Sequence, residues 1–584
     1  MKLKKLTALF LTAALTITSF AGCGGSKEGD KASGTGDTGA ATASSGETAS
    51  GEEMTIEIFD AAANYQGEQI GWFAKVVKDR FNIKLNIIAP QVAGAQVYQT
   101  RASSGNLGDI VLLDATDFTD CVAAGLVKDI SADIKGCSNL MAFQDQIDTY
   151  NKGIPGNSSG AIYGIPCEMT NTAPDKISAD VIYSSPMIRW DLYKEAGMPD
   201  INDLDGFLDL LEKIQAAHPT NADGDPAYAL SLWPDWDGND GMIGIANVVQ
   251  LTTWYGEKIK GSAILKPDNT FTEILDKNAS YYKIAKFLYK ANQRGLVDPD
   301  SGTQDWNAAC AKMSAGQVYL FWYSWQVGFW NTQDRLKDGT AFIFVPIKDQ
   351  KYYADSDTYF GSGRIIGVGS SVDDAKYQTI MKFLDWYASP EGCVFQHDGI
   401  EGFNYTKDAS GKFTIMNDNA LMDNLPVPEE YGGAGYSDGN NAINQWIVAG
   451  ISTNPESGET YSSQYWSSYK AATMTDMKRE WADRFGAAEP VEYMEKNNVL
   501  VVSPSVSVSL ESDTAEIGVI RNQCNAELCD ATWKMILTSK DDADFDKKWD
   551  EMCEKMRGLN FDELYKFDCA KHQVEVDAKI AALK

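Results

Sequence analysis

Several tryptophans stand in short segments whose residue pattern is that of loops rather than of a periodic core. The chain has 15 Trp, and these segments also carry Tyr and Asp. An indole face can cover the apolar C–H face of a pyranose ring, while neighbouring carboxylates hydrogen-bond its hydroxyls. The mixture predicts a carbohydrate site, although any single indole would bury equally well in a core. The candidate residues are Trp233, Trp236, Asp237, Trp254, Trp306, Trp322, Tyr323 and Trp325.

Catalytic and metal-binding patterns are sparse in the sequence. The three histidines, His218, His397 and His572, stand far apart, so neither a zinc site nor a His-based triad is expected. There is no His-Glu-x-x-His motif and no phosphate-binding Gly-Lys loop. The 82 acidic residues could still supply the two carboxylates of a glycoside hydrolase. We expect no enzyme, with a cell-surface glycoside hydrolase as the less favoured alternative.

The N-terminal segment has the layout of a secretory signal. Lys2, Lys4 and Lys5 precede an apolar stretch over residues 6–20, which is shorter than the roughly 20 residues that span a bilayer. Ala-Gly-Cys at 21–23 resembles a bacterial lipobox, with Phe20 where Leu is usual. The resemblance implies a signal peptide over 1–22 and lipidation of Cys23; an ordinary secreted protein is the alternative. We therefore expect an extracellular protein, lipid-anchored at the outer face of the cytoplasmic membrane.

Composition excludes some partners of the folded body. Residues 24–51 are rich in Gly, Ser, Thr and Ala, so residues 23–53 are interpreted as a lipidated Cys followed by a disordered tether.

The net charge of −31 makes nucleic acid an unsuitable partner, because binding it needs clustered Lys and Arg. The cysteines after Cys23 are odd in number and dispersed, which indicates buried thiols rather than a disulfide scaffold. We expect a monomer.

Strand and helix patterns alternate along the first part of the body. Residues 55–59 and 83–88 alternate like strands, and residues 69–81 between them have apolar side chains at helical spacing. Residues 110–113 are apolar throughout. These patterns predict an α/β fold with a mostly parallel, helix-covered sheet. Ligands bind beyond the carboxyl ends of such strands, and the candidates there are Asn64, Tyr65, Thr116 and Asp117.

A series of short motifs carries a family resemblance. Residues 104–110, Ser-Gly-Asn-Leu-Gly-Asp-Ile, are similar to the Ser-Gly-x-x-Pro-Asp-Ile segment of extracellular solute-binding proteins of ABC sugar importers, family 1. Gly108 stands where Pro is common. Further matches follow in the family's order at 162–166, 188–197, 295–300, 383–392 and 399–405. Each motif is weak alone, but their order, together with the lipobox, resembles the larger Gram-positive lipoproteins of this family.

The resemblance implies a function as well as a fold. It implies two α/β lobes of the type II periplasmic-binding-protein kind, joined by a hinge, that close over a ligand. Such a protein would capture a carbohydrate and deliver it to the permease subunits of an ABC transporter. The number of aromatic residues favours an oligosaccharide. The alternatives are a peptide or another solute, or a sensor lipoprotein; a peptide would favour strand-edge contacts and charged end-clamps.

The resemblance also suggests lobe boundaries. The first lobe is expected over 54–172 and 347–400, and the second over 173–346 and 401–584, with helices at 545–583 as part of a C-terminal extension. Arg364 could donate to a ligand or pair with an Asp across the lobe boundary. Asn221, Asp223 and Asp225 resemble a fragment of the calcium loop of some relatives. The fragment is short and lacks a downstream bidentate Glu, so we expect no cofactor. Calcium is the one metal ion that stays an alternative.

Overall fold

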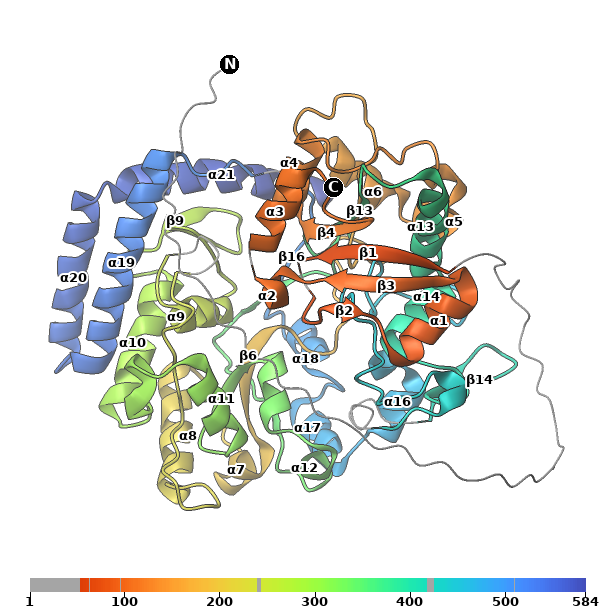
Figure 1. Ribbon diagram of the computed structural model, residues 1–584. Coiled ribbons are helices and arrows are strands. Elements are labelled where there is room, and N and C mark those ends of the chain that lie inside the picture. The colour runs from red at the N-terminus through yellow and green to blue at the C-terminus, as the bar shows by residue number, and fades with distance from the viewer. Residues whose placement is uncertain are drawn as a thin grey trace, which may run out of the picture. The chain divides into compact units, whose positions relative to one another are not determined.

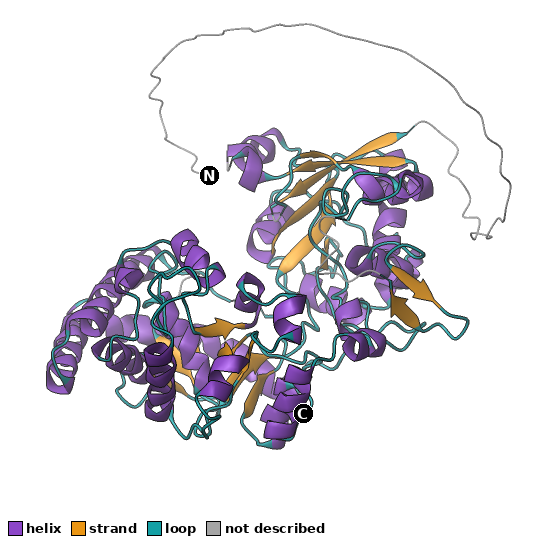
Figure 2. Cartoon of the chain, turned by 90° about the horizontal axis from the view of Figure 1, so that it is seen from below, coloured by secondary structure: helices purple, strands orange, loops and turns teal. Residues whose placement is uncertain are grey.

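The computed structural model describes residues 53–583, except 62, 95, 239–242, 417–424 and 509. The predicted signal peptide, Cys23 and the tether up to residue 52 lie outside the described residues. Within the described part, no helix is both long and apolar enough to cross a membrane. The described chain has two α/β lobes, each with its own sheet and core, and a helical C-terminal extension (Figures 1 and 2). The predicted fold class is thereby confirmed.

The sheet of the first lobe has the strand order β2-β3-β1-β4-β13-β5. β1 is parallel to β3 and β4, with Met54 opposite Ile83 and Ile58 opposite Ile110. β13 lies antiparallel between β4 and β5. The three strands predicted from the sequence are confirmed. The strands are β1 (Met54–Asp60), β2 (Gly67–Glu68), β3 (Ile83–Ile88), β4 (Ile110–Asp114), β5 (Gly164–Pro166) and β13 (Arg364–Val368).

Both faces of this sheet are covered, which explains the continuous apolar run in β4. Ile110 and Leu112 belong to one core, while Val111 and Leu113 belong to another that includes Phe118 of α4. Successive side chains of a strand point to opposite faces, so a strand buried on both sides is apolar throughout. The helices of this lobe are α1 (Gly71–Phe81), α2 (Pro90–Ala93), α3 (Gln96–Ser104), α4 (Ala115–Ala123), α5 (Ser138–Met141), α6 (Gln144–Lys152), α13 (Asp374–Tyr387) and α14 (Pro390–Asp398).

The second lobe has a sheet of order β10-β6-β11 and a small antiparallel sheet of order β7-β8-β9. β10 and β11 both run antiparallel to β6. The strands are β6 (Ser184–Arg189), β7 (Lys258–Lys260), β8 (Ala263–Leu265), β9 (Phe271–Glu273), β10 (Leu320–Tyr323) and β11 (Phe342–Phe344). The helices are α7 (Trp190–Glu195), α8 (Leu204–Ala217), α9 (Ala246–Leu251), α10 (Ser280–Gln293), α11 (Trp306–Ser314) and α12 (Gln333–Lys337).

The segments that cross between the lobes are hydrogen-bonded to one another. β12 (Tyr352–Asp355) pairs in parallel with β16 (Leu500–Ser503). Just beyond β12, the buried carboxylate of Asp357 accepts from Thr172 Oγ1 at 3.0 Å and from Ser178 N and Oγ at 3.0 and 2.6 Å. A buried carboxylate with three donors therefore ties two crossing segments together.

The structure differs from the predicted lobe boundaries. Buried side chains from Tyr405 to Trp466 pack in the core of the first lobe, whereas Ile347 and Tyr352 pack in that of the second. The assignment of 401–466 to the second lobe is therefore wrong, because this stretch has no periodic pattern to reveal where it packs. Its elements are β14 (Tyr405–Lys407), β15 (Phe413–Ile415), η6 (Glu429–Tyr431), η7 (Ser463–Tyr465) and α16 (Ser467–Ala472).

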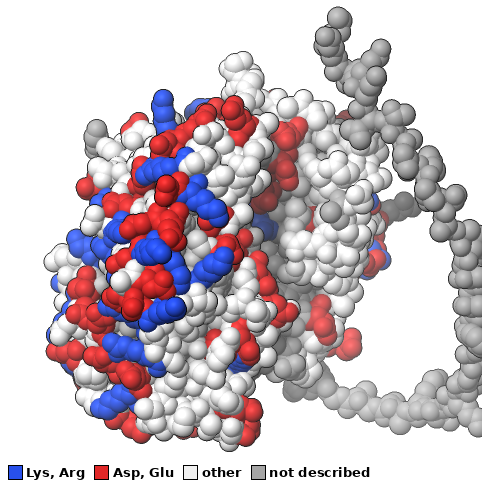
Figure 3. Space-filling view, turned by 90° about the vertical axis from the view of Figure 1, so that its left-hand side faces the viewer, with Lys and Arg blue, Asp and Glu red and all other residues white. Residues whose placement is uncertain are grey.

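The chain ends in helices that pack on the second lobe. α19 lies against α10 and α20, and the predicted helices at 545–583 are confirmed, with a buried row of Phe545, Trp549, Met552 and Met556 on α20. Acidic and basic side chains intermingle over the outer surface of this region (Figure 3), where Lys286 pairs with Asp546. The helices are α17 (Asp476–Phe485), α18 (Pro490–Lys496), α19 (Ala515–Thr538), α20 (Asp542–Gly558) and α21 (Phe561–Ala582).

Candidate ligand-binding site

Three of the predicted tryptophans form a partly exposed surface on the second lobe. The ring centroid of Trp306 lies 4.7 Å from that of Trp236 and 5.5 Å from that of Trp325, and Trp236 and Trp325 are 6.2 Å apart. Trp325 is 37 % exposed and Tyr183 beside it is 63 % exposed. Trp325 Nε1 donates to the Tyr183 hydroxyl at 3.2 Å. We call Trp236, Trp306, Trp325 and Tyr183 the aromatic platform.

The platform rests on a second layer of buried rings. Trp233 and Trp322 are fully buried and stack at 5.3 Å with an interplanar angle of 8°. Trp233 also lies 4.6 Å from Trp306, and the mostly buried Tyr323 lies 5.2 Å from Trp325. The prediction of Trp233 and Trp322 as ligand contacts is therefore corrected: both indoles have no exposed surface and support the platform from below.

Trp254 does not belong to this group. It is fully buried in the core of the second lobe and packs edge-to-face against Phe207 at 6.2 Å. Its prediction as a ligand contact is wrong for the same reason as for Trp233, because an indole that fills a core leaves no face for a ligand. Sequence alone could not separate these tryptophans, since all stand in segments of similar composition.

Local structure explains how Trp325 and Trp306 reach the platform. β10 is followed by the short helix η5 (Ser324–Phe329), and the buried Gln326 side chain accepts from the N–H groups of Trp322 and Tyr323 at 2.8 and 2.9 Å. This fixes the turn from which Trp325 projects. Trp306 begins α11, and its N–H donates to Asp235 Oδ2 at 2.7 Å. A buried amide and an exposed carboxylate thus hold two platform residues in place.

Asp237 follows Trp236 but is not available to a ligand as predicted. Its Oδ1 accepts from Ala246 N at 2.8 Å, and its Oδ2 accepts from Trp533 Nε1 at 2.7 Å. Burial raises the pKa of this carboxyl to about 6, although the two hydrogen bonds act in the opposite direction. Both oxygens already have internal donors, so the prediction of Asp237 as a direct ligand contact is corrected to a structural role beside the platform.

The first-lobe candidates lie at the carboxyl ends of strands, as expected. Thr116 and Asp117 are exposed in the first turn of α4, directly after β4. Burial and the neighbouring carboxylates of Asp114 and Asp120 raise the pKa of Asp117. Arg364 opens β13 opposite Asp114, with Nε 3.8 Å from its Oδ1. Arg364 therefore pairs within its own lobe rather than across the lobe boundary.

The other first-lobe candidates stand in the loop after β1. Asn64 and Tyr65 are exposed, and the Tyr65 hydroxyl donates to the carbonyl of Glu68 at 2.6 Å. Tyr65 is 37 % exposed. The structure thus brings the second-lobe aromatics together in one cluster and places Asn64, Tyr65, Thr116, Asp117 and Arg364 around the strand ends of the first lobe.

Tyr183 of the platform and Glu168 of the chain between the lobes were missed by sequence reasoning. Tyr183 precedes β6 and had no neighbouring Trp in sequence to draw attention to it. Glu168 has a left-handed backbone with φ of 58°, and its N–H donates to Trp446 O at 2.7 Å. A non-glycine residue in this region is strained by about 1–3 kcal/mol, which is common where segments are held for function. Glu168 stands where the chain leaves the first lobe.

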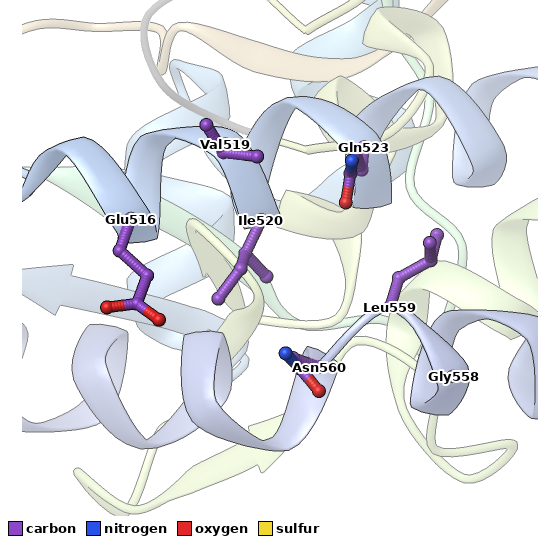
Figure 4. A pocket seen from close by; sticks show the side chains of 7 residues that line it. All are labelled: Glu516, Val519, Ile520, Gln523, Gly558, Leu559 and Asn560. Carbon is purple, nitrogen blue, oxygen red and sulfur yellow. The ribbon is translucent and has the colours of Figure 1, made fainter.

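Two cavities have walls without platform residues. One of about 460 Å³ is lined by Ser324 and Val327 of η5 and by Met187, Phe344 and Trp481, with the Asp180–Lys470 ion pair at 2.7 Å on its wall. Burial raises the pKa of Glu489 in the same wall. The other, of about 390 Å³, is an open hollow in the helical extension; its lining residues are Glu516, Val519, Ile520, Gln523, Gly558, Leu559 and Asn560 (Figure 4). No platform residue lines either cavity.

The acidic loop predicted as a weak calcium candidate lies apart from the platform in sequence, over residues 221–225. No group of three or more His, Cys, Asp or Glu side chains among the described residues is placed to hold a metal ion. Asn221 Oδ1 accepts from the N–H groups of Asp223 and Asp225 at 3.1 and 2.8 Å, so the short acidic loop is closed by its own hydrogen bonds. The Gly-x-Ser-x-Gly sequence at 156–160 lies in exposed turns and not at a strand-to-helix elbow.

Two α/β lobes joined by crossing segments, with aromatic rings on one and polar strand ends on the other, define a two-lobed binding protein. The chain belongs to the bacterial extracellular solute-binding protein family, whose model matches residues 66–392. The predicted family membership is confirmed. Among curated proteins, no relative matches this chain.

Several solved structures share the fold at low sequence identity. FusA, an ABC-transporter substrate-binding protein of Streptococcus pneumoniae in complex with kestose, is 15% identical with a TM-score of 0.56, covering 90% of this chain and 100% of its own. An HMO-binding solute-binding protein of Bifidobacterium longum infantis is 14% identical with a TM-score of 0.57, covering 91% and 100%. The alginate-binding protein AlgQ2 is 15% identical with a TM-score of 0.58, covering 91% and 100%.

Proposed function

We propose that this solute-binding protein captures an oligosaccharide on the aromatic platform and delivers it to an ABC importer. The observation that carries the proposal is the set of three indoles, Trp236, Trp306 and Trp325, whose centroids lie within 6.2 Å of a neighbour and which are all partly exposed. Several adjoining aromatic faces suit several pyranose or furanose rings, and the polar groups at the first-lobe strand ends suit their hydroxyls.

The likeness to other binding proteins supports the same ligand class. FusA is described in complex with kestose, AlgQ2 as alginate-binding and the Bifidobacterium protein as HMO-binding and ABC-transporter associated. The intermingled charges of Figure 3 and the net charge of −31 fit a partner other than nucleic acid. No catalytic role is proposed, because the family and the similar structures are described as binding proteins.

A thermal-shift screen tests the ligand class. Fructo-oligosaccharides, milk-type oligosaccharides, alginate oligomers and monosaccharides are each added to the purified protein, with and without calcium. A ligand at 100 times its Kd adds about 2.7 kcal/mol of stability and should raise the melting temperature visibly. We expect a selective shift with one oligosaccharide that stays intact afterwards. No shift with any sugar would favour a peptide, another solute or a sensor role, and released cleavage products would indicate a hydrolase.

The anchor at Cys23 is a separate part of the proposal. The proposal rests on the sequence Ala-Gly-Cys at 21–23, which resembles a lipobox. Replacing Cys23→Ser removes the sulfur that would carry a lipid. The protein should then move from the membrane fraction to the culture medium, because stable anchoring needs more than one acyl chain. Fractionation followed by immunoblotting measures this. Retention of the variant in the membrane fraction would contradict lipid anchoring at this residue.

A further inference from the structure

The loop that carries Trp236 is held from behind by the C-terminal helix α19. Trp533 on this helix donates its indole N–H to Asp237 Oδ2 at 2.7 Å, directly after the platform residue. Further along the loop, Gly244 N donates to Asn525 Oδ1 at 2.9 Å. Two residues of α19, about two helical turns apart, thus bind Asp237 and Gly244.

The approach between this loop and α19 is close. Gly238 has a left-handed backbone with φ of 71°, and a Cβ added there would lie 2.0 Å from Asn525 Nδ2. The loop is also tied to α9 and α10: Asp237 Oδ1 accepts from Ala246 N at 2.8 Å, and Ile245 N donates to the Tyr281 hydroxyl at 3.1 Å. The loop therefore meets α19 through defined polar bonds rather than through loose packing.

The consequence for the platform follows from the short distance along the chain. Trp236 is one residue from Asp237, and its ring packs at 5.3 Å on Trp233 and at 4.7 Å on Trp306. A loop that lost its bond to α19 would no longer hold the Trp236 ring against its neighbours. A binding surface loses affinity when its side chains must become ordered at the moment of binding. Loss of the bond to α19 would therefore lower the affinity for the ligand without removing any direct contact with it.

We propose that α19 is a positioning element for the ligand-binding platform, acting through Trp533 and Asn525 on the loop around Asp237. This rests on the proposed function, since it assigns the C-terminal extension a role at the same site. Trp533 and Asp237 are positioning residues: they touch the loop, not the ligand. The extension is thereby part of the binding machinery and not only a cover for the second lobe.

The bond between Asp237 and Trp533 gives the platform a pH dependence. Protonation converts two charge-assisted bonds into weaker neutral ones, and with a pKa of about 6 this occurs between neutral pH and pH 5. The groups facing Asp237 are Asp235 on the same loop, Tyr281 on α10 and Cys529 on α19, and burial raises the pKa of the last two so that both stay neutral.

Stability should change in the opposite sense. The folded pKa of Asp237 lies above its ordinary value of 3.8. Its contribution to stability is therefore complete below that value and is lost as the pH rises through about 6. Acidification from pH 7.5 to 5 should thus weaken ligand binding, while Asp237 causes no loss of stability. A purely structural role of Asp237 would not lower the affinity over this pH range.

The test compares Trp533→Phe, Asp237→Asn and the double variant in the full-length protein. Trp533→Phe keeps an aromatic ring at this position but removes the N–H donor together with part of the indole, whereas Asp237→Asn leaves the Trp533 side chain whole. We expect each single change to weaken binding of the oligosaccharide found in the thermal-shift screen by about tenfold, with no further loss in the double variant because both remove one bond. Lys534→Met is the control, since Lys534 is exposed on α19 and pairs with Asp530 on the same helix.

Two further readouts decide the outcome. The affinity of the wild type should fall several-fold from pH 7.5 to 5, and that of Asp237→Asn should not. Without ligand, hydrogen exchange over 233–238 and 243–248 should be faster in Trp533→Phe than in the wild type. Unchanged affinity in a sugar-binding protein, or unchanged exchange, would overturn the positioning role. If the wild type binds no sugar while exchange still responds to Trp533→Phe, the proposed function fails, and the bond is structural only.

Discussion

Replacing Arg521→Met should lower the free energy of unfolding by about 3–5 kcal/mol, the cost of leaving a buried charge without its partner. Arg521 on α19 donates to both oxygens of Asp568 on α21, at 3.0 and 2.7 Å, and to Asp513 at 2.6 Å. The side chains of Arg521 and Asp568 are only 10% and 1% exposed. The remaining donors to Asp568 are the N–H and hydroxyl of Ser262, at 2.7 and 2.6 Å, and neither is charged.

Chemical unfolding followed by fluorescence measures the effect, and the control is Arg479→Met. Arg479 on α17 pairs with Asp476 at 2.8 Å, but its side chain is 58% exposed, so its loss should cost under about 1 kcal/mol. An equally small change at Arg521 would mean that water reaches the Asp568 carboxylate. Because Ser262 immediately precedes β8, this ion pair also links the extension to the small sheet of the second lobe, and its loss should loosen α21 first.

Much of the first lobe could be predicted from sequence because its signals are local. The apolar run at 110–113 predicts a strand buried on both faces, and the structure divides its residues between two cores. By contrast, the packing of 401–466 on the same lobe could not be predicted. This stretch has short strands and many turns, and no hydrophobic period marks which lobe its buried side chains contact.

The aromatic cluster was predicted, but the role of each indole was not. Trp233 and Trp236 are three residues apart in one loop, yet the first is fully buried and the second partly exposed. Composition predicts that such residues gather, while burial depends on the strand, helix and loop contacts that meet around them. Asp237 shows the same limit: its residue type suits a sugar hydroxyl, but Trp533, almost 300 positions later in the printed sequence, already occupies it.

Trp325→Ala should weaken oligosaccharide binding by about 2 kcal/mol, or roughly 30-fold in Kd, the usual loss for a central aromatic contact. Trp325 is the most exposed indole of the platform at 37%, so its removal should disturb the fold little. Trp386→Ala is the control, because Trp386 is half-buried on α13 of the first lobe and packs against Phe81 rather than against the platform.

Isothermal titration and the unliganded melting temperature together separate binding from folding. The platform predicts a large change in Kd with a small change in melting temperature for Trp325→Ala, and unchanged Kd for Trp386→Ala. For the buried Trp233→Phe we expect the opposite result, a large fall in melting temperature with a small change in Kd. The substitution leaves a cavity beneath Trp306, which destabilises the lobe but removes no ligand contact. If Trp325→Ala binds within twofold of the wild type, the sugar does not stack on this platform, and the polar strand ends of the first lobe must carry the affinity instead.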